Sequence, residues 1–150
     1  MKRILVGLDG SPRAPGVLSA ATLVARANGG KLVLLRSVGL PPDIPQDFWK
    51  TTDESLLDLL QHQARSYLDE QASRVPKELF ERTEVIVGVP WQTICDAARR
   101  DNADLIVVGS HGYSGLDHII GTTAAKVVNH AGCSVLVVRD PARLQGTPRA

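Results

Sequence analysis

The stretch VVGSHGYSGLDHIIGTTAAKVV, residues 107–128, joins an apolar run to an alanine-rich segment through a loop with three closely spaced glycines. The apolar run is contiguous rather than alternating, which is typical of a strand buried on both faces of a parallel sheet. Gly121, Thr122 and Thr123 then open the alanine-rich segment, whose composition favours a helix. The stretch therefore predicts one strand–loop–helix unit of an α/β protein, with an unusually glycine-rich loop.

The same alternation of strand and helix continues over the whole chain. Contiguous apolar runs predict five strands, at residues 2–8, 31–38, 82–88, 104–109 and 134–138. Four helices are expected between them, at residues 12–28 (with Ser11 as the N-cap and Pro12 at the first position), 53–75, 90–100 and 121–131. Alternation of this kind predicts an open, doubly wound five-stranded parallel sheet with helices on both faces. We expect the strand order 3-2-1-4-5.

Length and composition set limits on what the chain can be. At 150 residues it is sized for a single domain, residues 1–150, with one core. A net charge of +1 with mixed signs argues against a nucleic-acid partner, which would favour a basic face. The apolar runs are too short to span a membrane, and Asp9 interrupts the N-terminus too early for a signal peptide. We therefore expect a cytoplasmic protein.

The strand order predicts where a ligand would bind. In doubly wound sheets ligands lie beyond the carboxyl ends of the strands, where the strand order reverses. With the order 3-2-1-4-5 this crevice lies between the first and fourth strands. Asp9 would then stand at one lip and Gly109 at the other, so the two most unusual loops of the sequence would face each other.

The glycine loop has the chemistry of a phosphate site. Phosphate oxygens need close hydrogen-bond donors, which bare peptide N–H groups and the N-terminus of a helix supply. Gly109 and Gly112 would let the backbone approach ribose and phosphate, and Gly121 would clear the entrance to the last helix. Thr122 and Thr123 could cap that helix or donate to phosphate. The alternative is a loop whose glycines serve only turn geometry.

With these residues in place, the chain resembles the universal stress proteins almost from end to end. The resemblance is carried by ILVGLDGSPRA (4–14), by Gly88-Val89-Pro90, by VVGSHGYSGL (107–116) and by GTTAAKVVNHAGCSVLVVR (121–139). It implies the fold described above. It also implies a nucleotide site, in members that carry a glycine, two residues, a second glycine, nine residues, and then glycine with serine or threonine.

The resemblance assigns a role to seven positions. Asp9 and Gly109 would contact ribose, and the backbone of Val38 would read adenine. Phosphates would be held by Gly112, Gly121 and Thr122, with Thr123 as a further donor.

The spacing of the glycine loop departs from the family pattern. Eight residues separate Gly112 from Gly121 here, one fewer than the pattern has. One residue corresponds to a few ångströms of chain. The loop either tightens and keeps the phosphate site or leaves that site tilted and weaker.

The resemblance predicts an ATP-binding or related adenine-nucleotide-binding module of stress response or regulation. Mg²⁺ or Mn²⁺ could be held by the phosphates. Universal stress proteins commonly dimerise through the last strand, which here would place Val135, Val137 and Val138 in a homodimer interface. The alternative from another class is a module of the same fold that binds no nucleotide and serves dimerisation or partner docking, which the shortened spacing favours.

Catalysis is harder to derive from these residues. A hydrolase needs a nucleophile or activated water, a base and an orienting group in one constellation, and none can be assembled. At most, a slow ATPase remains as a second alternative, with no catalytic residue to name. A phosphoacceptor receiver domain built on Asp9 is disfavoured, because it would need a carboxylate in place of Gly88 and a lysine in place of Arg139.

The sequence also predicts a proline-rich loop after the second strand. Residues 39–52 contain three prolines and end with Phe48 and Trp49. These aromatic side chains would pack the loop onto the body, or form part of a lid near adenine or of a partner surface.

Overall fold

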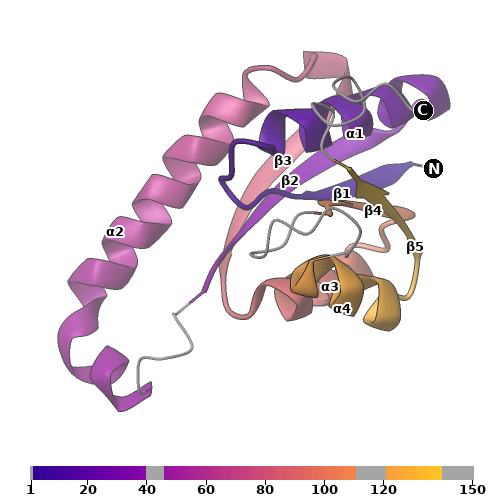
Figure 1. Cartoon of the computed structure of the whole chain (residues 1–150). Helices are drawn as coiled ribbons and strands as arrows, with labels where there is room; N and C mark the ends of the chain where they lie inside the picture. The colour runs from indigo at the N-terminus through magenta and orange to yellow at the C-terminus, as the bar shows by residue number, and fades with distance from the viewer. Residues whose placement is uncertain (1, 40–45, 111–120, 140–150) are drawn as a thin grey trace, which may run out of the picture.

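The computed structural model describes residues 2–39, 46–110 and 121–139, and within 46–55 only the course of the backbone. It contains the five predicted strands, which lie at Arg3–Gly7 (β1), Lys31–Val38 (β2), Phe80–Val87 (β3), Leu105–Gly109 (β4) and Ser134–Val138 (β5). All neighbouring strands pair in parallel, in the order β3-β2-β1-β4-β5 (Figure 1). The predicted fold class and strand order are therefore confirmed.

The helices lie at Ala14–Asn28 (α1), Gln46–Ala72 (α2), Pro90–Arg100 (α3) and Thr122–His130 (α4), with a short 3₁₀ turn at Lys77–Leu79. Helices α1 and α2 cover one face of the sheet and α3 and α4 cover the other (Figure 1). No helix within the described ranges is both long enough and apolar enough to cross a bilayer.

The two faces of the sheet build two separate hydrophobic clusters. Ile4 and Val6 of β1 pack with α1, whereas Leu5 between them packs with α3 and α4. Successive side chains of a strand point to opposite faces, so a strand covered on both sides must be apolar at every position. This requirement explains the contiguous apolar runs of the sequence.

The strand order reverses between β1 and β4. These strands pair with Leu5 beside Ile106 and Val6 beside Val107. The chain leaves β1 toward β2 on one side and leaves β4 toward β5 on the other, so the loops after β1 and β4 diverge at the carboxyl end of the sheet. The reversal therefore lies where the sequence predicts a crevice.

The start of α1 differs from the prediction. The helix begins at Ala14 with Arg13 as its N-cap, rather than at Pro12 after Ser11. The Asp9 carboxylate accepts a hydrogen bond from the Ser11 amide at 3.0 Å, and the Ser11 hydroxyl oxygen accepts one from the Arg13 amide at 3.2 Å. These side-chain bonds close separate turns and so delay the helix. Its end at Asn28 is as predicted, with Gly29 in the left-handed conformation.

Helix α2 begins at Gln46, well before the predicted residue 53, and ends at Ala72. The predicted loop is therefore wrong for residues 46–52, which are helical and include Phe48 and Trp49, while residues 40–45 lie outside the described part of the chain. The prediction relied on an apolar stripe, which this first part of the helix lacks. The other helix and strand ends lie within two residues of their predicted positions.

Candidate functional site

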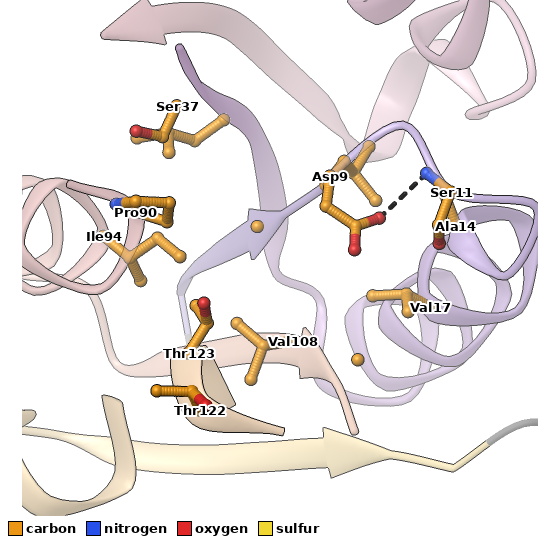
Figure 2. A pocket seen from close by; sticks show the side chains of 14 residues that line it. Asp9, Ser11, Ala14, Val17, Ser37, Pro90, Ile94, Val108, Thr122 and Thr123 are labelled. Atoms are coloured by element: carbon orange, nitrogen blue, oxygen red, sulfur yellow. Dashed lines mark hydrogen bonds between the residues drawn. The ribbon is translucent and has the colours of Figure 1, made fainter. Parts of the chain in front are cut away.

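A cavity of about 490 Å³ opens at the carboxyl ends of β1 and β4 (Figure 2). Its lining comes from β1 and the following turn, the first turns of α1, α3 and α4, and the ends of β2 and β4. The polar side chains that line it are those of Asp9, Ser11, Ser37, Thr122 and Thr123. The cavity lies in the predicted crevice.

The structure brings four of the predicted site residues to this one cavity: Asp9, Gly109, Thr122 and Thr123. They come from segments about a hundred residues apart, at the ends of two neighbouring strands and the start of α4. Figure 2 shows Asp9 beside the start of α1, with Thr122 and Thr123 at a separate part of the rim. The predicted role of each residue stays a prediction.

Gly121 does not line the cavity but sets the start of α4. It is the N-cap residue, and its amide donates to the Ser110 carbonyl at 2.8 Å. This amide is therefore engaged with the protein rather than turned toward a phosphate. The next amides, those of Thr122 and Thr123, belong to the first helical turn, where N–H groups have no partner within the helix.

Two other predicted residues stand apart from the cavity. Val38 is buried at the end of β2, and its carbonyl accepts the Gly88 amide at 3.1 Å. It is absent from the lining, to which β2 contributes Leu35 and Ser37 instead. Gly112 lies outside the described residues.

Several lining residues were not predicted from the sequence. Leu35 and Ser37 are two positions apart on β2 and therefore share the face that packs against α3. Ser37 interrupts the apolar residues of that face, and this interruption is the signal by which the sequence could have indicated a cavity residue. Pro90 and Ile94 from the start of α3 complete the same side of the cavity (Figure 2). The motif Gly88-Val89-Pro90 marked this turn, but not its position at the cavity.

The cavity has two chemically different ends. Leu35, Pro90 and Ile94 form an apolar end around the Ser37 hydroxyl. Elsewhere the rim offers the Asp9 carboxylate and the N-terminus of α4, whose first N–H groups have no partner within the helix and which carries a partial positive charge. This arrangement suits a ligand that joins a flat, weakly polar group to hydroxyls and an anion.

The turn that carries Asp9 packs against Arg36 of β2, and Arg36 in turn contacts Tyr67 of α2. Gly10 adopts the left-handed conformation, with φ +76°, and a Cβ atom there would lie 1.9 Å from Nη1 of Arg36. The Arg36 guanidinium also lies 4.8 Å from the ring centroid of Tyr67, within cation–π range. Burial raises the pKa of Tyr67, and the Arg36 charge opposes that rise. The Asp9 turn is thus packed against an Arg36–Tyr67 pair.

Acid–base chemistry has little support in the described lining. Asp9 is the only ionisable residue among the described residues that line the cavity. No group of three His, Cys, Asp or Glu residues that could hold a metal ion occurs within residues 2–39, 46–110 and 121–139.

Fold and cavity together define a doubly wound α/β domain with a ligand crevice where its strand order reverses. The model of the universal stress protein family matches residues 1–139. The chain belongs to this family.

Individual relatives match over nearly the whole chain. Universal stress protein A homolog 1 of Coxiella burnetii is 33% identical over 138 residues, which are 91% of this chain and 95% of the relative. The solved structure of universal stress protein UspA from Lactobacillus plantarum superimposes with a TM-score of 0.77 at 26% identity, covering 92% of this chain and 97% of that one. A universal stress protein from Archaeoglobus fulgidus in complex with dAMP has a TM-score of 0.65 at 23% identity, with coverages of 92% and 98%.

Proposed function

We propose that this chain binds an adenine nucleotide, ATP or a close relative, in the cavity between β1 and β4. The observation that carries the proposal is the convergence of Asp9, Gly109, Thr122 and Thr123 on one cavity. In this proposal the protein is a nucleotide-responsive stress or regulatory module, and binding rather than turnover is its activity. A cytoplasmic location would give it access to the cellular ATP pool.

Charge decides how the nucleotide would lie. The Asp9 carboxylate would repel phosphate oxygens but accept hydrogen bonds from ribose hydroxyls. The amides of Thr122 and Thr123 at the start of α4 would attract phosphate oxygens. The ribose is therefore expected beside Asp9 and Gly109, and the phosphates beside α4, with Mg²⁺ or Mn²⁺ held chiefly by the phosphates and water.

The base would occupy the apolar end. Leu35, Pro90 and Ile94 offer surface to a flat ring. The expectation that the Val38 backbone reads adenine is retained as part of the proposal, since a carbonyl that accepts one hydrogen bond keeps a second lone pair. The A. fulgidus relative bound to dAMP, an adenine nucleotide, supports the choice of base.

A homodimer is part of the proposal. Strand β5 pairs only with β4 in the described sheet, and its valines Val135, Val137 and Val138 are half-buried. An apolar edge strand of this kind favours association with a second chain. Sedimentation velocity is expected to show a dimer, and a monomer at micromolar concentration would contradict this part of the proposal.

A thermal-shift titration with Mg-ATP tests nucleotide binding. A ligand at 100 times its dissociation constant stabilises the folded state by about 2.7 kcal/mol. For a chain of this size the melting temperature should rise by roughly 5–10 °C. An unchanged melting temperature at millimolar Mg-ATP would contradict the proposal and favour the module that docks a partner without nucleotide. ADP release that is linear in time and proportional to protein would favour the slow ATPase.

A further inference from the structure

The hydroxyl of Ser37 lies at the apolar end of the cavity, and its hydrogen is already engaged in a hydrogen bond. Ser37 Oγ donates to the Gly88 carbonyl oxygen at 2.8 Å. A serine hydroxyl has one hydrogen to donate and two lone pairs. With the hydrogen bound to Gly88, the hydroxyl can offer only lone pairs to a ligand.

The Gly88 carbonyl is held in place, so this hydrogen bond is well defined. The Gly88 amide donates to the Val38 carbonyl at 3.1 Å, which ties the turn after β3 to the end of β2. Gly88 has φ +155°, and a Cβ atom there would lie 2.8 Å from Cγ2 of Thr93. A change of residue or backbone at Gly88 is therefore disfavoured. If the Ser37 proton turned to a ligand, the bond to Gly88 would be lost.

Among the described lining side chains, the neighbours of Ser37 cannot form a hydrogen bond with a base. The cavity side chains around it, Leu35, Pro90 and Ile94, are apolar and offer no hydrogen-bonding side-chain group to a base. Figure 2 places Ser37, Pro90 and Ile94 together, across the cavity from Asp9 and Ser11. Of the described lining residues, a base that entered this end would meet one polar side chain, and that side chain is an acceptor.

We propose that Ser37 selects the base, favouring one whose edge carries an exocyclic amine over one that carries a keto oxygen at the same position. The inference rests on the proposed nucleotide function and adds a specificity residue to it. An amine would donate to the free lone pairs of Ser37 Oγ. A keto oxygen would bring its own lone pairs against them, which leaves two acceptors facing each other.

Three triphosphates that differ at the 6-position of the purine test the proposal. ATP carries an amine and purine riboside triphosphate carries hydrogen, whereas inosine triphosphate carries a keto oxygen and also a proton on N1, so the comparison of the first two isolates the amine. By isothermal titration we expect ATP to bind roughly three- to tenfold tighter than purine riboside triphosphate, the range that one neutral hydrogen bond supplies. Inosine triphosphate should bind more weakly than either.

Two variants test whether Ser37 causes the preference for a base with an exocyclic amine. In Ser37→Ala the ratio of affinities for ATP and purine riboside triphosphate should fall, leaving only the preference that the Val38 carbonyl supplies. Ser37→Cys keeps a side chain of similar size but offers only a weak acceptor, so the ratio should fall there as well.

The matched control is Thr93→Val. Thr93 is buried in the same junction, its hydroxyl donates to the Pro90 carbonyl at 2.9 Å, and it does not line the cavity. The variant removes a hydroxyl and one hydrogen bond without touching the ligand, so the wild-type ratio should persist.

The outcomes separate this inference from the proposed function. Equal affinities of the wild type for all three triphosphates would overturn the role of Ser37 and leave nucleotide binding intact. A ratio lost equally in Thr93→Val would also overturn it, because the cause would then be a loosened junction. If no triphosphate binds, the proposed function fails and the inference fails with it.

Discussion

The two ends of the sheet carry their polar groups in opposite ways. At the amino end, arginines and carboxylates satisfy one another: Arg3 pairs with Glu81 at 3.1 Å, and Arg82 pairs with Glu81 at 2.6 Å. At the carboxyl end, the polar groups surround a cavity of about 490 Å³. One end is closed by its own side chains, and the other leaves room for a ligand.

Asp101 and Asp104 show how the amino end is built. Asp101 pairs with Arg82 and Arg100, and the hydrogen bond from Arg100 is the main cause of its lowered pKa. Asp104 accepts the amides of Lys2 and Arg3 at 2.7 and 2.9 Å, which lowers its pKa too. These groups join the start of β1 to the start of β4, so we assign them to stability rather than to binding.

The largest effect is expected from Gly10→Ala. A Cβ atom there would be placed 1.9 Å from Arg36 Nη1, so the guanidinium must move from its position over Tyr67, and alanine is in addition strained at this left-handed position. We expect a loss of about 1–3 kcal/mol in the free energy of unfolding. ATP affinity should fall at least about tenfold, a drop of about 1.4 kcal/mol. Urea unfolding and isothermal titration measure the two effects.

Gly29→Ala is the control for that variant. Gly29 is also left-handed, with φ +67°, but a Cβ atom there meets nothing within 4 Å. The Gly29→Ala variant should lose only about 1 kcal/mol in its free energy of unfolding, and its ATP affinity should be unchanged. If both variants weakened binding equally, the support that Arg36 gives to the Asp9 turn would be disproved.

A smaller effect is expected from Asp9→Asn. Asparagine keeps an oxygen for the Ser11 amide but removes the charge offered to ribose hydroxyls. Because hydrogen bonds to charged groups are stronger than neutral ones, ATP affinity should fall by about tenfold. Isothermal titration with ATP measures this fall.

Asp104→Asn applies the same change at the other end of the sheet. Asp104 accepts two backbone amides and lies far from the cavity lining. Stability should fall slightly while ATP affinity stays at the wild-type value. The reverse pattern, with binding lost in Asp104→Asn and kept in Asp9→Asn, would reverse the assignment of the two ends.

The smallest effect is a pH dependence of stability from the amino end. The folded-state pKa values of Asp101 and Asp104 are lowered from 3.8, so their contribution is present above that value and is lost as the pH falls through the folded pKa values. Urea unfolding should show falling stability below about pH 4. The fall should be shallower in Asp104→Asn. The contribution of Asp104 is small because its carboxylate is exposed and screened by solvent. An unchanged pH profile in the variant would show that Asp104 adds nothing.

Local sequence signals placed most of the elements but missed two helix starts. The start of α1 was misplaced because the side chains of Asp9 and Ser11 close turns that compete with a helix, and a Ser-Pro pair does not reveal this competition. The start of α2 was missed because residues 46–55 lack the apolar periodicity on which the prediction relied. Both errors concern helix starts, which local sequence patterns place less reliably than the existence of a helix.

For the candidate site, sequence and structure contributed different parts. Asp9, Gly109, Thr122 and Thr123 follow from their positions after strands and before a helix, which parallel pairing brings to one edge. Ser37 could not be distinguished from Val38 as the cavity residue without the structure, because the choice depends on which face of β2 turns toward α3. The contact of Gly10 with Arg36 likewise joins segments that no local pattern connects.

The sequence by itself determined the alternation of strands and helices, their parallel arrangement and the end of α1 at Gly29. It could do so because burial on both faces and a left-handed glycine each leave a mark within a few residues. Only the tertiary structure decided that the apolar end of the cavity is made by Leu35, Ser37, Pro90 and Ile94. The reason is that this wall exists only when β2 and α3 pack together, and the packing of distant segments is not encoded in any one of them.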